Sequence, residues 1–171
     1  TSLFAGSTTL VYDGRFLPDR AIELIQKFNV TSWGGTVPTT LKRILDKAES
    51  DKLNLASVLV VGGGGAPMPS ELIDRTKQVF PNSQYSFGYG YGLTESGAIT
   101  IINWGENLKN EPSSPGQPMP TIQVELRNEE GKAIKKDSIE GEIYVKSPSV
   151  MLGYYNNPEA SAAALTSDRW L

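Results

Sequence analysis

The sequence predicts an α/β protein with a mostly parallel sheet and flanking helices, followed by a small antiparallel β subdomain. Apolar, β-branched segments alternate with amphipathic helical segments up to about residue 100, which is the pattern of a parallel α/β sheet. Residues 105–120 are then rich in proline, glycine, serine and asparagine, as in a connecting segment. Beyond them, apolar residues recur at every second position, which is typical of half-buried antiparallel strands.

Proline marks the start of each expected helix, at Pro18, Pro38 and Pro69. The helix after Pro38 has the clearest pattern, because its apolar residues recur at i, i+3, i+4 and i+7. These residues are Leu41, Ile44, Leu45 and Ala48. The spacing places them on one face of the helix, and we expect that face to be buried.

The expected strands of the first sheet alternate with these helices. Thr8–Tyr12 is a β-branched and aromatic run that ends at the turn-forming pair Asp13-Gly14. Val58–Val61 is a continuous apolar run, as expected for a strand covered on both faces of a parallel sheet. The other expected strands are Val30–Trp33, Tyr85–Phe87 and Ala98–Ile102.

The expected antiparallel subdomain contains two runs of alternating residues. The apolar positions are Ile122, Val124 and Leu126 in the first run and Ile143 and Val145 in the second. The stretch Asn128–Lys132 between them reads as a hairpin-type connection. We therefore expect an α/β part at residues 1–104, followed at residues 105–171 by a linker and the start of the antiparallel subdomain.

Composition narrows the chemistry available to this chain. It has 171 residues with 16 basic and 19 acidic side chains, and its net charge of -3 offers no electrostatic footprint for nucleic acid. It contains no cysteine and no histidine, which excludes disulfides, thiolate metal sites and nucleophiles activated by histidine. No apolar run approaches the ~20 residues of a membrane span. We expect a soluble, cytoplasmic protein without a transmembrane segment.

The glycines Gly62–Gly65 lie between an expected strand and an expected helix, where ligands of parallel α/β sheets tend to bind. Pro67 and Met68 occupy the place of a third spaced glycine, and no Gly-Lys-Ser or Gly-Lys-Thr follows. Neither the dinucleotide nor the P-loop fingerprint is therefore met. Two interpretations stay open at this point: a loop for close strand–helix packing, or a ligand-contacting loop with phosphate near the free amides of the next helix.

The second glycine-rich stretch, Gly88–Glu95, also follows an expected strand. Its glycines allow a backbone to approach a flat ligand, and its tyrosines offer a stacking surface. The Thr94 hydroxyl can bond a phosphate oxygen, and the Glu95 carboxylate can hold Mg²⁺. In isolation, the same residues also fit an ordinary glycine-tyrosine turn with a solvated Glu95.

Three ordered motifs resemble the adenylate-forming superfamily, which comprises acyl- and aryl-CoA synthetases, firefly luciferase and peptide-synthetase adenylation domains. The motifs are Gly62–Met68 (GGGGAPM), Tyr91–Glu95 (YGLTE) and Gly141–Ala160, which begins GEIYV and ends GYYNNPEA. Pro115–Pro118 also resembles the glycine-proline entrance to that family's β subdomain. The similarity covers nearly the whole chain.

The resemblance implies an activity and its partners. A carboxylic acid and ATP would give an acyl-adenylate and pyrophosphate, and the acyl group would then pass to coenzyme A, with Mg²⁺ as the metal. Glycine-Leu-Thr-Glu, as in Gly92–Glu95, is more typical of the CoA ligase branches for fatty or aromatic acids than of peptide synthetases. Tyr89 departs from the polar residue that many acyl-CoA synthetases have at this place.

The resemblance also implies a role for each matched site residue. The implied nucleotide-binding set is Gly64, Gly65, Ala66 and Pro67 along the adenine, with the Tyr91 ring against it, together with Gly92 and Thr94. Thr94 would bond the α-phosphate and Glu95 would hold Mg²⁺, and these two are the implied catalytic residues. The acyl chain would run past Gly65, Gly90 and Ile99. The family thus places adenine, rather than phosphate, at the first glycine segment.

Several parts of that family's machinery have no match in this chain. These are the phosphate loop with its lysine, the ribose-binding aspartate, and the C-terminal domain with its catalytic lysine. Thr1 is not methionine and Leu171 follows no evident final element, so we expect a piece of a longer enzyme that is inactive alone. Two alternatives stay open: an adenylation domain that loads an amino or aryl acid onto a carrier protein, and a non-catalytic nucleotide-binding scaffold.

Overall fold

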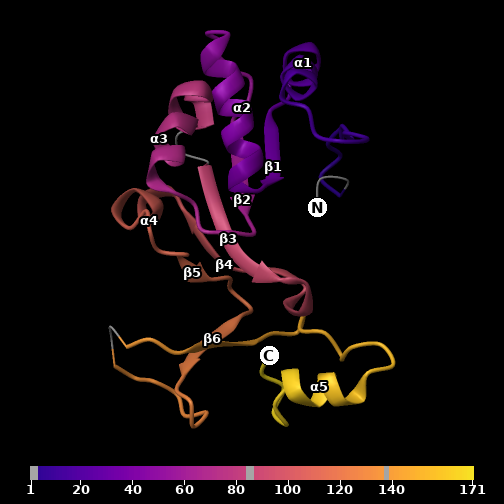
Figure 1. Ribbon diagram of the computed structural model, residues 1–171, viewed down its shortest axis with the longest axis vertical. Coiled ribbons are helices and arrows are strands. Elements are labelled where there is room, and N and C mark those ends of the chain that lie inside the picture. The colour runs from indigo at the N-terminus through magenta and orange to yellow at the C-terminus, as the bar shows by residue number, and fades with distance from the viewer. Residues whose placement is uncertain (1–3, 84–86, 137–138) are drawn as a thin grey trace.

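The computed structural model describes residues 4–83, 87–136 and 139–171. Three helices lie against a five-stranded sheet, and a second, two-stranded sheet lies at the opposite end of the molecule from α1 (Figure 1). The helices are α1 (Pro18–Phe28), α2 (Pro38–Ser50) and α3 (Ser70–Val79). The strands of the larger sheet are β1 (Ser32–Thr36), β2 (Val60–Gly64), β3 (Phe87–Leu93), β4 (Ala98–Trp104) and β5 (Gln117–Pro118).

The strand order of the larger sheet is the same as the chain order, β1 to β5. β1, β2 and β3 run parallel, each joined to the next by a connection that contains a helix, whereas β4 and β5 add antiparallel. Short α4 (Gly105–Asn110) follows β4 and buries Leu108. The expected α/β class is therefore confirmed, with a parallel part that is extended on one edge by antiparallel strands.

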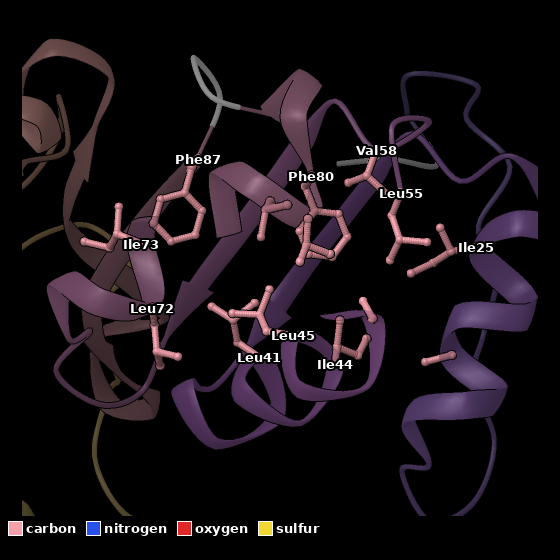
Figure 2. Packing of buried hydrophobic residues seen from close by; sticks show 14 of the residues in the cluster. Ile25, Leu41, Ile44, Leu45, Leu55, Val58, Leu72, Ile73, Phe80 and Phe87 are labelled. Carbon is pink, nitrogen blue, oxygen red and sulfur yellow. The ribbon is translucent and has the colours of Figure 1, made fainter. Parts of the chain in front are cut away.

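α2 lies at the centre of the hydrophobic core, between α1 and α3 (Figure 2). Its apolar residues at helical spacing are all fully buried, as the sequence predicts: Leu41, Ile44, Leu45 and Ala48. α1 contributes Ile22 and Ile25 to the same core, and the sheet contributes Val61 and Phe87. The prolines at the start of α1 and α2 fix φ at a value that suits a first helical turn.

The second sheet pairs β6 (Gln123–Arg127) with β7 (Glu142–Lys146). Val124 lies opposite Val145 and Leu126 opposite Ile143, so the predicted period-two faces meet, and the expected antiparallel structure is confirmed. The Asn128–Lys132 turn leads first to a bridge between Arg127 and Ala133 rather than directly into β7. Beyond β7 the chain forms α5 (Pro158–Ala164).

The expected strand at Thr8–Tyr12 is wrong, because this segment has no neighbouring strand to pair with in the part of the chain that the structure describes. Its last residue instead supports α1. The Tyr12 hydroxyl accepts a hydrogen bond from the Leu17 backbone N–H at 2.9 Å, and the Tyr12 ring lies 5.9 Å from the ring of Phe16. Tyr12 therefore stabilises the start of α1 and takes no part in a sheet.

Two strand boundaries and one prediction of burial also differ from expectation. β1 begins at Ser32 instead of Val30, and β2 begins at Val60 and takes in Gly62–Gly64, which were expected to end the strand. The expectation that Val58–Val61 is covered on both faces is wrong, since Val60 is 42% exposed. The helices cover one face of the sheet, and Val60 lies on the other. Of the expected strand Tyr85–Phe87, only Phe87 lies within the described residues.

Membrane spanning was not expected, and no helix in residues 4–83, 87–136 or 139–171 is both long and apolar enough to cross a bilayer.

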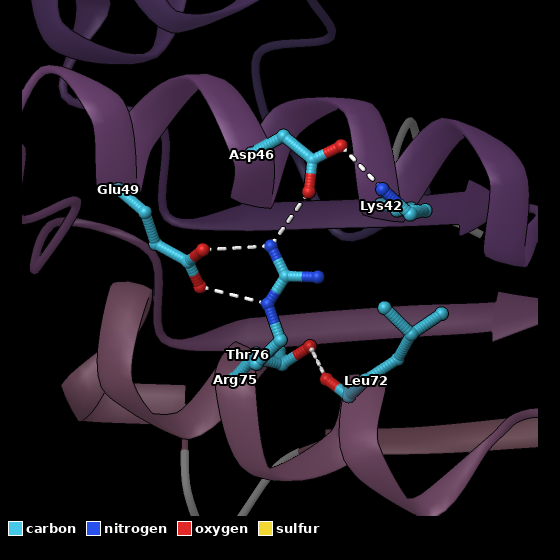
Figure 3. Close-up of polar contacts among 6 residues, drawn as sticks. All are labelled: Lys42, Asp46, Glu49, Leu72, Arg75 and Thr76. Carbon is cyan, nitrogen blue, oxygen red and sulfur yellow. Dashed lines mark hydrogen bonds and ion pairs between the residues drawn. The ribbon is translucent and has the colours of Figure 1, made fainter.

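A network of charged side chains joins α2 to α3 on the outer surface (Figure 3). The Arg75 guanidinium donates from Nε and Nη2 to the two carboxylate oxygens of Glu49, at 2.9 and 2.7 Å, and from Nη2 to Asp46 at 2.7 Å. Lys42 reaches the other oxygen of Asp46 at 2.6 Å. Lys42 and then Arg75 hold the pKa of Asp46 below its usual 3.8, and Arg75 holds the pKa of Glu49 below 4.5.

We expect Arg75→Met to lower the free energy of unfolding by about 1 kcal/mol at neutral pH, because the bidentate pair of Arg75 with Glu49 is stronger than an ordinary exposed ion pair. The pKa values of Asp46 and Glu49 are lower in the folded protein, so their contribution is complete above the unfolded values. This stabilising contribution is lost as the pH falls through the pKa values that the two carboxylates have in the folded protein. Urea unfolding at about pH 7 and about pH 3 should therefore show the Arg75→Met difference shrinking in acid.

Lys77→Met is the matched control, since Lys77 lies on the same helix in a single exposed pair with Asp74 at 3.2 Å. It should change stability by less than about 0.5 kcal/mol. If Arg75→Met lowers the free energy of unfolding no more than Lys77→Met does, the network adds nothing to stability beyond a single exposed ion pair.

Candidate functional site

β3 divides the candidate site into two sides. Pairing with β4 places Tyr89 opposite Asn103 and Gly90 opposite Ile102. Because side chains alternate along a strand, Tyr89 packs into the core beside the helices while Gly88 and Gly90 face the uncovered side of the sheet. A loop or turn over the whole of Gly88–Glu95 is therefore wrong, because Gly88–Leu93 form a strand that is hydrogen-bonded to β2 and β4, and only Thr94 and Glu95 lie in a turn.

The first cavity lies on the uncovered side and is called here the sheet-face pocket. Its volume is about 490 Å³, within the usual range of small-molecule sites. Glycines make its floor, and Val60, Ile99, Ile102 and Trp104 supply apolar surface around it. Ile99 and Trp104 are 49% and 62% exposed, so this apolar surface is accessible to a ligand.

The second cavity lies where β2 ends and is called here the strand-end pocket. Its volume is about 670 Å³, and it is lined by the segment Gly65–Ser70, by β3 from Tyr89 to Gly92, and by Ser113 and Pro115. Gly65 begins the turn away from β2 with φ of +76°, a value that favours glycine. The turn carries Ala66 and Pro67 outward while Met68 returns to the core.

The two pockets share Gly65, Tyr89 and Gly90. Backbones approach closely at this boundary, because a Cβ on Gly64 would lie 2.8 Å from the Gly90 carbonyl oxygen. A Cβ on Gly90 would lie 2.7 Å from a methyl carbon of Ile99 and 3.0 Å from the Ile101 carbonyl oxygen. The pockets therefore adjoin at these shared residues, with closely packed backbone between them.

The structure brings most of the proposed nucleotide residues together. Gly65, Ala66, Pro67, Tyr91 and Gly92 all line the strand-end pocket, whereas Gly64 lines the sheet-face pocket. The proposed acyl-contacting residues Gly65, Gly90 and Ile99 all line the sheet-face pocket. The two sets overlap at the boundary: Gly65 and Gly90 line both pockets, and only Ile99 of the acyl set lines the sheet-face pocket alone. Thr94 and Glu95 line neither cavity.

Thr94 and Glu95 lie in the 3₁₀ turn Thr94–Ser96, directly after β3. The buried Ser96 hydroxyl fixes this turn: it accepts from the Leu93 N–H at 3.2 Å and lies 2.8 Å from the Leu93 carbonyl oxygen. Gly97 closes the turn with φ of +83°. The Thr94 side chain is left exposed and Glu95 half-buried, so both are accessible to a ligand.

Glu95 fits a metal that arrives with a nucleotide better than a metal held by protein alone. In the described part of the chain, no group of three or more acidic residues could hold an ion, and no lysine or arginine pairs with Glu95. Mg²⁺ is commonly held by one or two carboxylates together with substrate phosphates and water. The residues present therefore fit Mg²⁺ as a partner of bound ATP.

Sequence reasoning missed Tyr154, which donates a hydrogen bond to Glu95 Oε1 at 2.9 Å. Tyr154 belongs to the Gly-Tyr pair of the third motif, but nothing in that motif alone indicated a contact 59 residues away. The carboxylate of Glu95 raises the pKa of the Tyr154 phenol by accepting this hydrogen bond, since the bond favours the protonated form.

Sequence reasoning also missed the role of Tyr89. Its hydroxyl lies 2.7 Å from the Pro112 carbonyl oxygen and 2.6 Å from that of Ser114. The fully buried Asn103 amide donates to the Ser114 carbonyl as well, at 2.8 Å. Burial raises the pKa of Tyr89, and the neighbouring Asn103 opposes that effect. Tyr89 therefore holds the segment that makes the far wall of the strand-end pocket.

Comparison with known proteins gives consistent results. A sequence model of the AMP-binding enzyme family matches residues 1–155. 4-Coumarate–CoA ligase 1 of Arabidopsis thaliana is 34% identical over 157 residues, which cover 88% of this chain and 27% of that enzyme. Long-chain-fatty-acid–CoA ligase of Bacillus subtilis (strain 168) is 34% identical over 159 residues, which cover 92% of this chain and 27% of that enzyme.

Among solved structures, a benzoate CoA ligase from Burkholderia xenovorans LB400 has a TM-score of 0.85 and 26% sequence identity. The similarity covers 99% of this chain and 33% of that one. The chain thus spans about a third, or less, of the length of the proteins that it matches.

We expect Gly92→Ala to destabilise the protein by about 3 kcal/mol, because a Cβ at this position would overlap the Ala98 carbonyl oxygen and push β3 from β4. Gly34→Ala is the control, since Gly34 has open space around it and no positive φ. Its stability should change by less than about 1 kcal/mol. Thermal unfolding of both variants measures the difference, and equal melting temperatures would show that β3 and β4 tolerate separation.

Proposed function

The chain belongs to the AMP-binding enzyme family, and from that premise we propose that it forms the adenylation site of a CoA ligase. The observation that carries the proposal is the pair of pockets that meet at Gly65, Tyr89 and Gly90. Formation of an acyl-adenylate needs a carboxylic acid and ATP side by side. Two cavities that share these residues supply neighbouring positions for the two reactants, beside one short stretch of β3.

In this proposal the strand-end pocket binds ATP. The backbone of Gly65–Pro67 lies along the adenine, and the 38% exposed Tyr91 ring provides a flat apolar surface for it. Thr94 donates its hydroxyl hydrogen to the α-phosphate from the turn beyond β3. Glu95 holds Mg²⁺, which offsets the negative charge of the phosphates when it is bound.

The sheet-face pocket binds the carboxylic acid. Its lining carries no charged side chain, and Thr36, Tyr89 and Trp104 are the residues in it with polar side-chain atoms, which favours a hydrocarbon or aromatic acid over an amino acid. The acid presents its carboxylate at the Gly90 boundary. A carboxylate oxygen then bonds to the α-phosphorus, the bond from that phosphorus to the β-phosphate bridge oxygen breaks, and pyrophosphate leaves with the electron pair. Thr94 orients the α-phosphate during this step.

Coenzyme A is the proposed acceptor in the second step, where its sulfur takes the acyl group and AMP leaves. We propose that both steps require the longer enzyme, because the chain spans 27% of its CoA ligase relatives. Purified residues 1–171 should then release no pyrophosphate from ATP with benzoic, 4-coumaric or palmitic acid. Turnover by this chain alone would contradict that part of the proposal.

In the complete enzyme, we expect Glu95→Ala to lower kcat/KM for ATP–pyrophosphate exchange by about 100-fold, because charge developing on the phosphates loses its metal partner. Glu129→Ala is the control, since Glu129 is exposed in the turn after β6. It should retain the wild-type rate. Equal activity of wild type and Glu95→Ala would remove the metal role of Glu95, and no exchange with any carboxylic acid would refute adenylation itself.

We expect Ile99→Ala to raise KM for benzoic and 4-coumaric acid about tenfold, since it removes apolar contact from the sheet-face pocket. KM for ATP should change by less than about twofold, because Ile99 does not line the strand-end pocket. Leu59→Ala is the control: Leu59 is similarly exposed, at 48%, but does not line the pocket. A rise in KM for ATP but not for the acid would mean that the pocket assignments are reversed.

A further inference from the structure

The segment Ser147–Tyr154 returns from the second sheet and lies against the Thr94–Gly97 turn. The Met151 N–H donates to the Glu95 carbonyl oxygen at 2.7 Å, and the Ser149 hydroxyl donates to the Ser96 carbonyl oxygen at 2.7 Å. Gly97 packs so closely on Ser149 that a Cβ there would lie 2.8 Å from the Ser149 carbonyl oxygen. Hydrogen bonds to the backbone of the turn therefore already hold the segment and the turn together.

The hydrogen bond from Tyr154 differs from these contacts because it ends on a side chain. Its phenol donates to Oε1 of Glu95 at 2.9 Å, while no described residue donates to Oε2. A free glutamate side chain samples many rotamers, and fixing it in one of them costs conformational entropy. A donor on one oxygen restricts the carboxylate and leaves the other oxygen available.

Tyr154 is itself held in place from the other side. Its backbone N–H donates to the Ser161 hydroxyl at 2.8 Å, and that hydroxyl donates onward to the Asn157 carbonyl oxygen at 2.7 Å. The Arg169 guanidinium donates to the carbonyl oxygens of Met151 and Leu152, at 2.6 and 3.3 Å. The phenol is thus presented to Glu95 by a segment that is braced by α5 and by the chain after it.

We propose that Tyr154 is a positioning residue for Glu95: its phenol holds Oε1 so that Oε2 faces a nucleotide-bound divalent cation. The inference rests on the proposed function, in which Glu95 holds that cation. Partners that orient a metal-binding carboxylate raise the metal affinity of a site, because less freedom is lost on binding. Since Met151 and Ser149 tie the segment independently, removal of the phenol hydroxyl leaves the segment in place.

The test measures Mn²⁺ binding by electron paramagnetic resonance, in the complete enzyme with a non-hydrolysable ATP analogue, and needs no turnover. Tyr154→Phe should weaken Mn²⁺ binding about tenfold and Glu95→Gln at least as much. Tyr155→Phe is the matched control, because the neighbouring Tyr155 is 93% exposed. It should bind Mn²⁺ as the wild type does.

A second control separates positioning from general loosening. Ser149→Ala removes the hydrogen bond to the Ser96 carbonyl but keeps the Tyr154 phenol. It should lower the melting temperature and leave Mn²⁺ affinity unchanged, whereas Tyr154→Phe should mainly change Mn²⁺ affinity. If Ser149→Ala weakens Mn²⁺ binding as much as Tyr154→Phe does, the positioning role is overturned.

The remaining outcomes distinguish this inference from the proposed function. Normal Mn²⁺ binding by Tyr154→Phe, with weak binding by Glu95→Gln, overturns the role of Tyr154 and leaves Glu95 as the metal ligand. Equal Mn²⁺ binding by wild type and Glu95→Gln overturns the metal role of Glu95, and the role of Tyr154 with it.

Discussion

The close approach of three backbones at β3 is the constraint on which the site depends. Gly64 meets the Gly90 carbonyl, Gly88 lies near the Asn103 carbonyl, and Gly92 lies on that of Ala98. A side chain at any of these positions would separate the strands or fill the space beside them. Because Gly64, Gly88 and Gly90 face the uncovered side of the sheet, they leave a cavity there, while Tyr89 and Tyr91 contribute to the other pocket. The alternation of glycine and tyrosine along β3 therefore shapes both the sheet-face pocket and the strand-end pocket.

Local patterns in the sequence were sufficient for α1, α2, α3 and the second sheet, whereas α4 lies in residues 105–120, which were expected to be a connecting segment. The spacing of Leu41, Ile44, Leu45 and Ala48 specifies a buried face without reference to the rest of the chain. Strands were harder to predict, since a strand exists only where a partner lies beside it. Thr8–Tyr12 has strand composition but no partner among the described residues, and Gly88–Leu93 has poor strand composition but a partner on each side.

The sequence named candidate site residues but gave little of their arrangement in space. Spacing alone left Gly62–Gly65 open between packing and ligand binding, and the order of the motifs favoured the second interpretation. The structure then separated the residues into two cavities, a division that the alternation along β3 implies once it is known to be a strand. Tyr89 and Tyr154 were missed because their partners lie 23 and 59 residues away, and such contacts leave no local pattern.

The contacts of Ser149 and Tyr154 with the Thr94–Gly97 turn also affect the order in which the site forms during synthesis on the ribosome. Ser149 follows Ser96 by 53 residues and Tyr154 follows Glu95 by 59, so the ribosome completes the turn long before it adds the residues that fix it. At about 5–20 residues per second, that interval lasts on the order of 3–12 seconds. The first sheet can pair its strands β1 to β4 during this time. The Glu95 carboxylate therefore gains its hydrogen bond from Tyr154 only after all the residues that line the two pockets have been synthesised.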